Sequence, residues 1–170
     1  MNQHAYFMGL ALKQAWTALA AGEFPVGAVI VADGAVAAEG GRSNSHGSKP
    51  TELDHAEIVA LRRLLGRQPA IDRTKLTVYA TMEPCLMCYT ALLLNGVRRF
   101  VYAYEDVMSG GTSLPLAQLA PLYREMASAV EIVPDIRRRE SLALFRQFFR
   151  CPDNSYWRDS LLATYTLGQL

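Results

Sequence analysis

Apolar and polar positions along the chain change period several times, and these changes predict a succession of helices and strands. Residues 3–21 have the pattern of an amphipathic helix, in which polar residues such as Lys13 interrupt the apolar positions, and the pattern stops at Gly22. Two β-rich apolar runs then flank Asp33 and Gly34, a dipeptide suited to the tight turn between antiparallel strands. We therefore expect an N-terminal helix followed by a hairpin.

The middle of the chain alternates between strand and helix patterns. After a turn-rich loop, the segment DHAEIVALRRLLG predicts a helix with Asp54 as its N-cap and Gly66 at its end. Strand KLTVYATM leads into helix PCLMCYTALLLNG, with Pro84 at the first helical position and Gly96 just past the end. Then follow strand RRFVYAYE, short helix LAQLAPLY, strand SAVEIV and the long amphipathic helix DIRRRESLALFRQFF.

This order predicts an α/β fold. Strand–helix–strand units favour parallel pairing through right-handed crossovers, whereas the hairpin must be antiparallel. We expect a three-layer α/β/α domain around a mixed five-stranded sheet over residues 1–150. Residues 151–170 form a C-terminal extension that adds one short helix and either packs on the domain or covers an active site.

Composition limits the classes of protein to consider. A chain of 170 residues, 51% hydrophobic and 19% charged, is typical of a soluble globular domain. Three cysteines do not make a disulfide framework, so we expect a reducing compartment, the cytoplasm. No apolar run approaches the ~20 residues that span a membrane. A net charge of +1 gives no global support for nucleic-acid binding, although a local basic patch, such as Arg137–Arg139, stays open.

The first candidate for chemistry is the pair Cys85 and Cys88. They fall in the first turn of a predicted helix, on one face. The free backbone N–H groups and the positive end of the helix dipole favour thiolates there. On this pair alone, zinc binding, thiol redox chemistry and core packing all remain open.

His55 and Glu57 change the balance, because they also lie at the start of a predicted helix. If the two helix N-termini converge, His55, Cys85 and Cys88 supply three ligands and leave a fourth position for water, which is typical of catalytic zinc. Zinc lowers the pKa of bound water to ~7, and Glu57 is placed to carry the proton from water to a substrate.

Other interpretations compete with a catalytic site. Asp54 and Glu57 can form a capping box that only stabilises the helix start. A thioredoxin-like redox protein also carries C-x-x-C after a strand, but it would leave His55 and Glu57 unexplained. A non-catalytic structural zinc module would need a fourth protein ligand, for which Cys151, His46 and His4 are the candidates.

The motifs HAE and PCLMC match the H-x-E…P-C-x-x-C signature of zinc nucleobase deaminases. The chain resembles the cytidine deaminase superfamily over about residues 1–150. The segments GEFPVGAVIV, HAEIVALR, MEPCLMC and LFRQFF are most similar to its bacterial tRNA adenosine deaminase branch. The resemblance implies the cytidine deaminase-like fold, a hydrolase that removes an exocyclic amine as ammonia, and a homodimer.

The resemblance also implies roles for individual residues. One Zn²⁺ per chain would be held by His55, Cys85 and Cys88, with Glu57 as the proton shuttle. The backbone N–H of Ala56 and the side chain of Asn44 would contact the base. The substrate would be an adenosine in a tRNA anticodon loop, converted to inosine.

Three departures from the branch leave the substrate open. The family's usual PTAHAE reads PTELDHAE here, two residues longer, so that Arg42 can take the place given to Asn44. The loop YEDVMSGGTSLP lacks the branch's common lysine. The aromatic tail SYWRDSLLATYTL is either a lid that selects small substrates, as in the related guanine deaminases, or a helix that covers exposed core. The alternative is therefore a deaminase of a free base, nucleoside or nucleotide of the guanine, cytosine or cytidine type.

Overall fold

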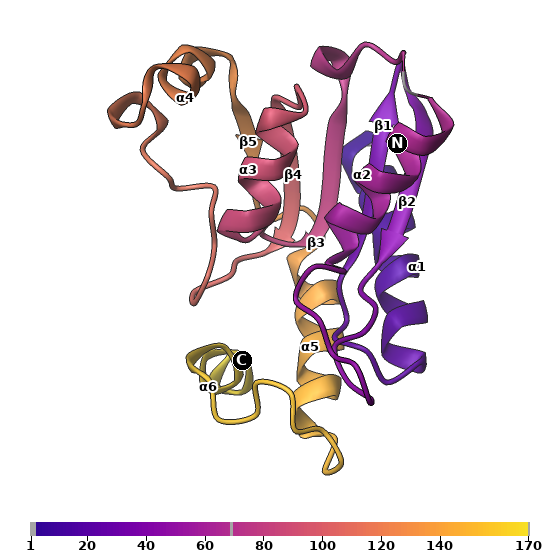
Figure 1. Cartoon of the computed structure of the whole chain (residues 1–170). Coiled ribbons are helices and arrows are strands. Elements are labelled where there is room, and N and C mark those ends of the chain that lie inside the picture. The colour runs from indigo at the N-terminus through magenta and orange to yellow at the C-terminus, as the bar shows by residue number, and fades with distance from the viewer. Residues whose placement is uncertain (1–2, 69, 170) are drawn as a thin grey trace.

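A computed structural model describes residues 3–68 and 70–169. The chain folds into three layers around a mixed five-stranded sheet, which confirms the predicted fold class (Figure 1). The strands lie in the order β2-β1-β3-β4-β5. β1 pairs antiparallel with β2 and β3, whereas β4 pairs parallel with β3 and β5. The strand bounds are β1 Gly27–Ala32, β2 Ala35–Gly41, β3 Thr77–Met82, β4 Arg99–Tyr104 and β5 Glu131–Val133.

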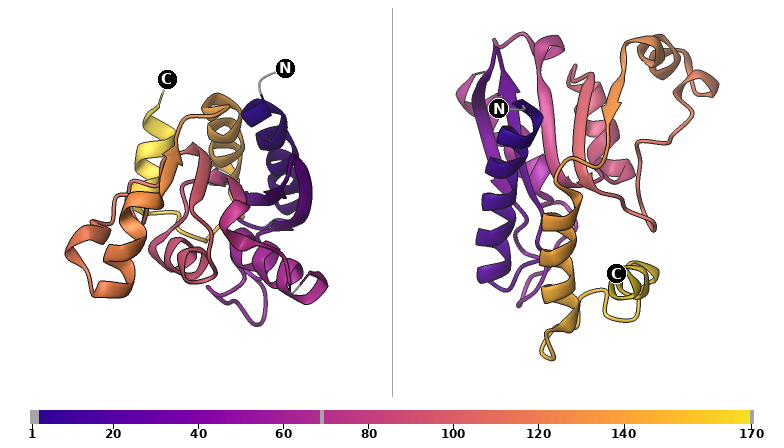
Figure 2. Two further views of the ribbon diagram at one scale, coloured as in Figure 1. Left: turned by 90° about the horizontal axis from the view of Figure 1, so that it is seen from above. Right: turned by 180° about the vertical axis from the view of Figure 1, so that it is seen from behind.

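The helices cover both faces of the sheet. α1 and α5 lie on one face and α2 and α3 on the other, as the view from above in Figure 2 shows. One apolar core lies between α1 and the sheet, and a larger one extends from beneath α2 and α3 to α5 and α6. The helix bounds are α1 Gln3–Ala20, α2 Ala56–Arg67, α3 Leu86–Leu94, α4 Pro121–Met126, α5 Arg138–Arg150 and α6 Leu161–Gly168.

The hairpin holds α2 in place. Its turn has positive φ angles at Asp33 (47°) and Gly34 (79°), as the tight turn predicted from sequence requires. In β2, a Cβ atom at Gly40 would overlap the backbone of α2 at Ala56 and Ala60. The absence of a side chain at Gly40 therefore lets the N-terminal end of α2 lie directly on the sheet.

The starts of α2 and α3 differ from the prediction. α2 begins at Ala56 with His55 as its N-cap, and it continues one residue past Gly66. Asp54 does not cap the helix, because its carboxylate accepts hydrogen bonds from Arg62 and Asn44 instead. α3 begins at Leu86 with Cys85 as N-cap, so Pro84 lies outside it; Gly96, with φ of 92°, follows its end as predicted.

Neither N-cap side chain forms a capping hydrogen bond within the described residues, although His55 and Cys85 occupy these positions. Residues of other types, such as Ser or Asp, usually fill an N-cap because they accept a backbone N–H. Here the imidazole and the thiol are left available for another role. The two helix starts come together at the end of the sheet where the central strand, β3, ends.

The C-terminal segment continues beyond this end of the sheet and finishes in α6, which lies below the strand ends in Figure 1. Leu162 and Ala163 of α6 are buried in the larger core, and α6 packs against α5. Thr166 forms a buried 2.9 Å hydrogen bond with the hydroxyl of Tyr104 in β4. Among the described helices, none combines the length and the apolar character needed to cross a membrane.

Candidate active site

The structure brings the three predicted metal ligands together. The Nδ1 atom of His55 lies 3.5 Å from the sulfur atoms of both Cys85 and Cys88. The three potential ligand atoms all lie within 4.8 Å of one another. One imidazole nitrogen and two thiolate sulfurs are a donor set that suits zinc, and three protein ligands leave a fourth position open. The residues therefore fit the metal that their types predict.

The three groups also shift one another's pKa values. For Cys85, a hydrogen bond from Cys88 and the nearby His55 lower the thiol pKa to about 4, although burial opposes this shift. Burial also opposes the charged form of His55, but hydrogen bonds to Cys85 and Glu52 and the negative charges of Cys85 and Glu57 raise its pKa to about 9. The hydrogen bond to Cys85, with burial, raises the pKa of Cys88. The surroundings of Cys85 thus favour its thiolate form.

Glu57 lies beside these groups in the first turn of α2. Its side chain is buried, with the residue only 3% exposed, and Cys88 Sγ donates to its carboxylate at 3.6 Å. Burial, together with the negative charge of Cys85, raises its pKa to about 7. A carboxyl group with a pKa near neutral pH can both accept and release a proton, as a general acid–base catalyst must. The side chain of the N-cap residue, His55, forms no capping hydrogen bond at this helix start.

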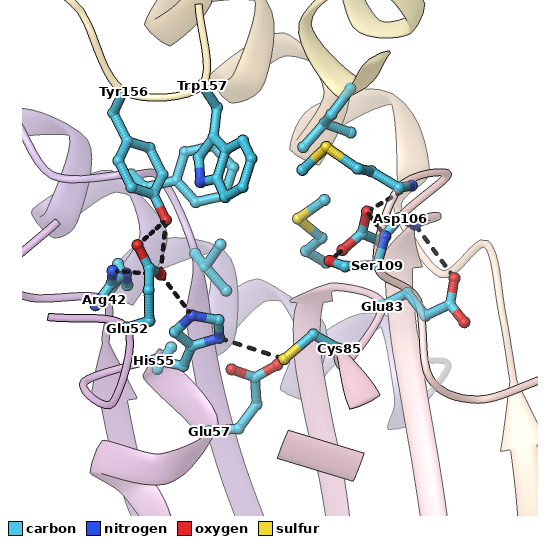
Figure 3. A pocket seen from close by; sticks show the side chains of 16 residues that line it. Arg42, Glu52, His55, Glu57, Glu83, Cys85, Asp106, Ser109, Tyr156 and Trp157 are labelled. Atoms are coloured by element: carbon cyan, nitrogen blue, oxygen red, sulfur yellow. Dashed lines mark hydrogen bonds and ion pairs between the residues drawn. The ribbon is translucent and has the colours of Figure 1, made fainter. Parts of the chain in front are cut away.

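A pocket of about 70 Å³ opens above this cluster. Figure 3 shows His55, Glu57 and Cys85 on one side and Tyr156 and Trp157 on the other. We call the metal-ligand cluster with Glu57 the floor of the pocket. The aromatic pair and Leu162, all from the C-terminal segment, are its roof. The C-terminal segment both packs into the core and covers this pocket.

One side wall comes from the loop that follows β4. The carboxylate of Glu83 accepts hydrogen bonds from the backbone N–H groups of Asp106 and Thr112, at 3.2 Å each. Asp106 in turn accepts from the backbone N–H groups of Met108 and Ser109 at 3.0 and 2.9 Å. Because these carboxylates are occupied in shaping the loop, we assign them a structural role.

The two predicted substrate-contacting residues lie in different surroundings. Ala56 lines the pocket. Asn44 lies outside it, with its side-chain nitrogen 2.7 Å from Asp54 and its backbone N–H bound to Glu23. Arg42, the alternative to Asn44 in the sequence alignment, lines the pocket instead. The structure therefore brings Ala56 to the floor and leaves Asn44 on the supporting loop.

Arg42 is a buried cation in this wall, only 3% exposed. Its Nη1 donates to the carbonyl of Ser43 at 2.6 Å and its Nη2 to Glu52 at 3.1 Å. Its Nε has no hydrogen-bond partner within the described part of the chain. A buried donor without a partner is costly, so Arg42 Nε is a candidate to meet an acceptor of a substrate.

Sequence reasoning missed Glu52 and did not place Tyr156 individually. Glu52 lies in the two-residue-longer PTELDHAE segment, and Tyr156 in the aromatic tail, so both departures from the family pattern carried the signal. The hydroxyl of Tyr156 donates to Glu52 at 3.0 Å, across 104 residues of chain. Nothing local in the sequence predicts a contact of this separation.

The candidate fourth ligands of a structural zinc module lie elsewhere. His4 bonds the hydroxyl of Tyr79, His46 lies 3.7 Å from Glu23, and Cys151 is exposed at the end of α5. Within the described residues, the one group of three that could hold a metal is His55, Cys85 and Cys88. This arrangement favours an open site over a closed one.

Comparisons with known proteins agree with this geometry. The model of the cytidine and deoxycytidylate deaminase zinc-binding region matches residues 1–104. A tRNA-specific adenosine deaminase of Agrobacterium fabrum is 33% identical over 162 residues, covering 88% of this chain and 96% of the relative.

Solved structures of deaminases are also similar to this chain in fold. One, from work on A-to-I editing by tRNA:A34 deaminases at the wobble position, has a TM-score of 0.65 at 26% identity and covers 82% of this chain and 98% of that one. The guanine deaminase of Bacillus subtilis has a TM-score of 0.54 at 35% identity and covers 62% of this chain and 66% of that one.

Proposed function

The chain belongs to the cytidine and deoxycytidylate deaminase family of zinc-binding enzymes, in its tRNA-specific adenosine deaminase branch, and from this membership we propose that it converts adenosine to inosine in a tRNA. The reaction is a hydrolytic deamination, in which the C–N bond to the exocyclic amine breaks and ammonia leaves. The observation that carries the proposal is the meeting of His55, Cys85 and Cys88 beside a buried Glu57.

We assign the steps of the reaction to residues of the floor. His55, Cys85 and Cys88 would hold one zinc ion per chain, whose Lewis acidity lowers the pKa of water to about 7 in enzymes of this kind. Glu57 accepts the proton of the attacking water and delivers it to the base, ending at the leaving amine. Its pKa of about 7 suits it to both tasks at neutral pH.

The base itself must lie between the floor and the roof. The N–H of Ala56, in the first turn of α2, and the Nε of Arg42 are the donors that we assign to acceptor atoms of the base. Phe24 and Tyr156 supply aromatic surface in the same pocket, and their ring centroids lie 5.2 Å apart. Asn44 would then act by supporting the loop through Asp54 rather than by contact with the base.

A second candidate is a free base or other small substrate, guanine being one example. Two observations favour it. The roof covers the pocket, whereas an RNA must present a flipped base together with its neighbouring phosphates. Of the basic residues available for phosphates, Arg42 is paired with Glu52, Arg137 with Glu140 and Arg138 with Glu105. Under this candidate the C-terminal segment, residues 151–170, determines the specificity of the domain formed by residues 1–150.

Ammonia release across one substrate panel separates the two candidates. The panel contains a tRNA anticodon stem-loop with adenosine, free adenosine, guanine, cytosine, cytidine and deoxycytidylate, with Glu57→Ala as control. Glu57-dependent release from the stem-loop alone is the expected result. Release from a free base or nucleoside would establish the second candidate. No release from any member by zinc-loaded protein would contradict both substrate assignments.

We also propose that the protein acts as a homodimer in the cytoplasm, as an enzyme of tRNA would. Light scattering coupled to size-exclusion chromatography tests the first point, with twice the mass of the 18.8 kDa chain as the expected value. Metal analysis of the same sample tests the proposed ratio of one zinc per chain. A ratio that stays near one half after incubation with excess zinc would contradict one zinc per chain.

A further inference from the structure

Glu52 lies where the floor and the roof of the pocket meet. Its carboxylate is 3.2 Å from Nε2 of His55, 3.1 Å from Nη2 of Arg42 and 3.0 Å from the hydroxyl of Tyr156. Figure 3 shows these contacts converging on one carboxylate group. Glu52 thus connects a residue of the floor, a buried cation of the wall and an aromatic residue of the roof.

Glu52 contacts the ring nitrogen of His55 that faces away from the two cysteines. Its Nδ1 faces the two cysteine sulfurs, so a metal would bind there, and the remaining proton of a neutral imidazole must be on Nε2. Nε2 is the atom that faces Glu52. A carboxylate that accepts the second N–H of a metal-binding histidine fixes its tautomer and its ring orientation and makes it a stronger ligand.

We propose that Glu52 is a positioning residue that orients the metal ligand His55 and that Tyr156 of the C-terminal segment helps to hold Glu52 in place. The proposal deepens the proposed function and rests on its assignment of His55 as a ligand. Docking of the roof then strengthens metal binding in the floor, because Tyr156 reaches the metal ligand through one intervening side chain.

Two further observations support the positioning role of Glu52. Glu52 lies in the loop that precedes α2, three residues before His55, so one short segment supplies both the carboxylate and the metal ligand that it contacts. Arg42 is buried, yet its charge is balanced here by Glu52. The Arg42 guanidinium also lies 5.9 Å from the centre of the Tyr156 ring. Arg42 and Tyr156 therefore contact each other as well as Glu52.

The solvent exposure of Glu52 limits the loss of zinc affinity that its replacement should cause. The side chain of Glu52 is 60% exposed, so its contacts are weaker than those of a buried carboxylate. Loss of the partner of a metal-binding histidine typically lowers metal affinity by about 10- to 100-fold. For an exposed carboxylate we expect the lower end of this range, about tenfold. Loss of the Tyr156 hydroxyl alone should have a smaller effect in the same direction.

The test compares zinc affinities, measured by competition with a chromophoric chelator, and the visible spectra of the Co²⁺-substituted proteins. The variants are Glu52→Ala, Glu52→Gln and Tyr156→Phe, with Glu125→Ala, at an exposed position on α4, as the matched control. We expect an affinity loss of about tenfold for Glu52→Ala. Glu52→Gln should be intermediate, because its amide oxygen can still accept from His55. Tyr156→Phe should lose less, and the Co²⁺ bands should shift in Glu52→Ala.

These readouts need no substrate, so they separate this proposal from the proposed function. If the substrate panel fails while Glu52→Ala still weakens zinc binding, the positioning role stands without the deaminase assignment. An unchanged zinc affinity and Co²⁺ spectrum in Glu52→Ala, relative to Glu125→Ala, would overturn the role of Glu52. An unchanged affinity in Tyr156→Phe, with the loss seen in Glu52→Ala, would overturn the coupling to the roof.

Discussion

The floor and the roof of the pocket are built from different kinds of structure. The floor combines two helix starts, those of α2 and α3, and its Glu57 and Cys88 are buried. The roof comes from a single segment near the C-terminus, and its Trp157 is 44% exposed. The floor supplies reactive groups, whereas the roof supplies aromatic surface. The comparison distinguishes the groups that we propose for the reaction from the aromatic surface that we propose to face the substrate, and Glu52 contacts both.

The largest expected effect is loss of the metal from the floor. Cys88→Ser removes one of the three proposed zinc ligands, and we expect most of the zinc and all of the measurable activity to disappear. Elemental analysis of purified protein measures the first effect. Cys151→Ser is the matched control, since Cys151 is exposed at the end of α5 and should leave zinc content unchanged. Zinc loss in Cys151→Ser would favour the structural zinc module instead.

The second-largest expected effect is a loss of activity without a loss of zinc. Glu57→Gln keeps the shape of the side chain but cannot carry a proton, so kcat should fall by about 10²- to 10⁴-fold. Zinc content should stay close to that of the wild type, because Glu57 is not one of the grouped ligands. The assay uses the substrate found active in the panel, with Glu125→Gln as control. A kcat within tenfold of the wild-type value would remove Glu57 from the reaction.

A smaller effect is expected where the roof is attached to the core. Thr166→Val keeps the shape of the side chain but leaves the buried hydroxyl of Tyr104 without its 2.9 Å partner. An unpaired buried hydroxyl costs about 1–3 kcal/mol in the free energy of unfolding. Urea denaturation measures this loss, with exposed Thr164→Val on the same helix as control. Equal stabilities of the two variants would show that this hydrogen bond does not anchor α6.

The smallest expected effect is on the free energy of unfolding, and it comes from the ion pair between Glu105 and Arg138 beside α6. Burial opposes the charge of Glu105, but hydrogen bonds from Arg138 and Tyr165 outweigh burial and lower its pKa. A carboxylate with a lowered pKa stabilises the fold above its unfolded pKa of about 4.3, and the contribution disappears as the pH falls through the folded value. Because the pair is partly exposed, we expect less than about 1 kcal/mol.

The comparison for this ion pair is wild type against Glu105→Gln, each unfolded in urea at pH 7 and near pH 3. The wild type should be more stable at pH 7, and the difference should shrink as the pH falls towards the lowered pKa of Glu105. A difference that is the same at both pH values would assign the effect of the substitution to packing rather than to charge.

The fold and the floor could be predicted because their signals are local. The period of the apolar positions places α1, α2, α3 and α5, and Asp33-Gly34 places the hairpin turn. His55, Glu57, Cys85 and Cys88 fall within two short motifs at helix starts. Once the strand order is known, the end of β3 brings these motifs to one edge.

Predictions were less accurate where one local signal competed with another. Asp54 is a good capping residue by type, but Arg62 and Asn44 occupy its carboxylate, so His55 becomes the N-cap. The predicted helix LAQLAPLY divides into a short 3₁₀ turn and α4, because Pro121 starts a new helix. The last strand shortens to β5, since residues 127–129 form another 3₁₀ turn.

The roof and its link to the floor could not be predicted in detail. The aromatic tail indicated either a lid or a helix that covers the core, and in the structure α6 packs on the core while Tyr156 and Trp157 cover the pocket. The contact of Tyr156 with Glu52 depends on how two distant loops meet, which no periodicity records. The sequence also does not show that Arg42, and not Asn44, lines the wall of the pocket.

The uncapped starts of α2 and α3 have a thermodynamic consequence. A metal bound there would cross-link chain positions 30 residues apart, from His55 to Cys85, much as a disulfide does, but reversibly. A ligand that binds only the folded chain adds RT ln(1 + [L]/Kd) to its stability, about 2.7 kcal/mol at a free concentration 100 times Kd. The melting temperature of this protein should therefore report the free zinc concentration around it.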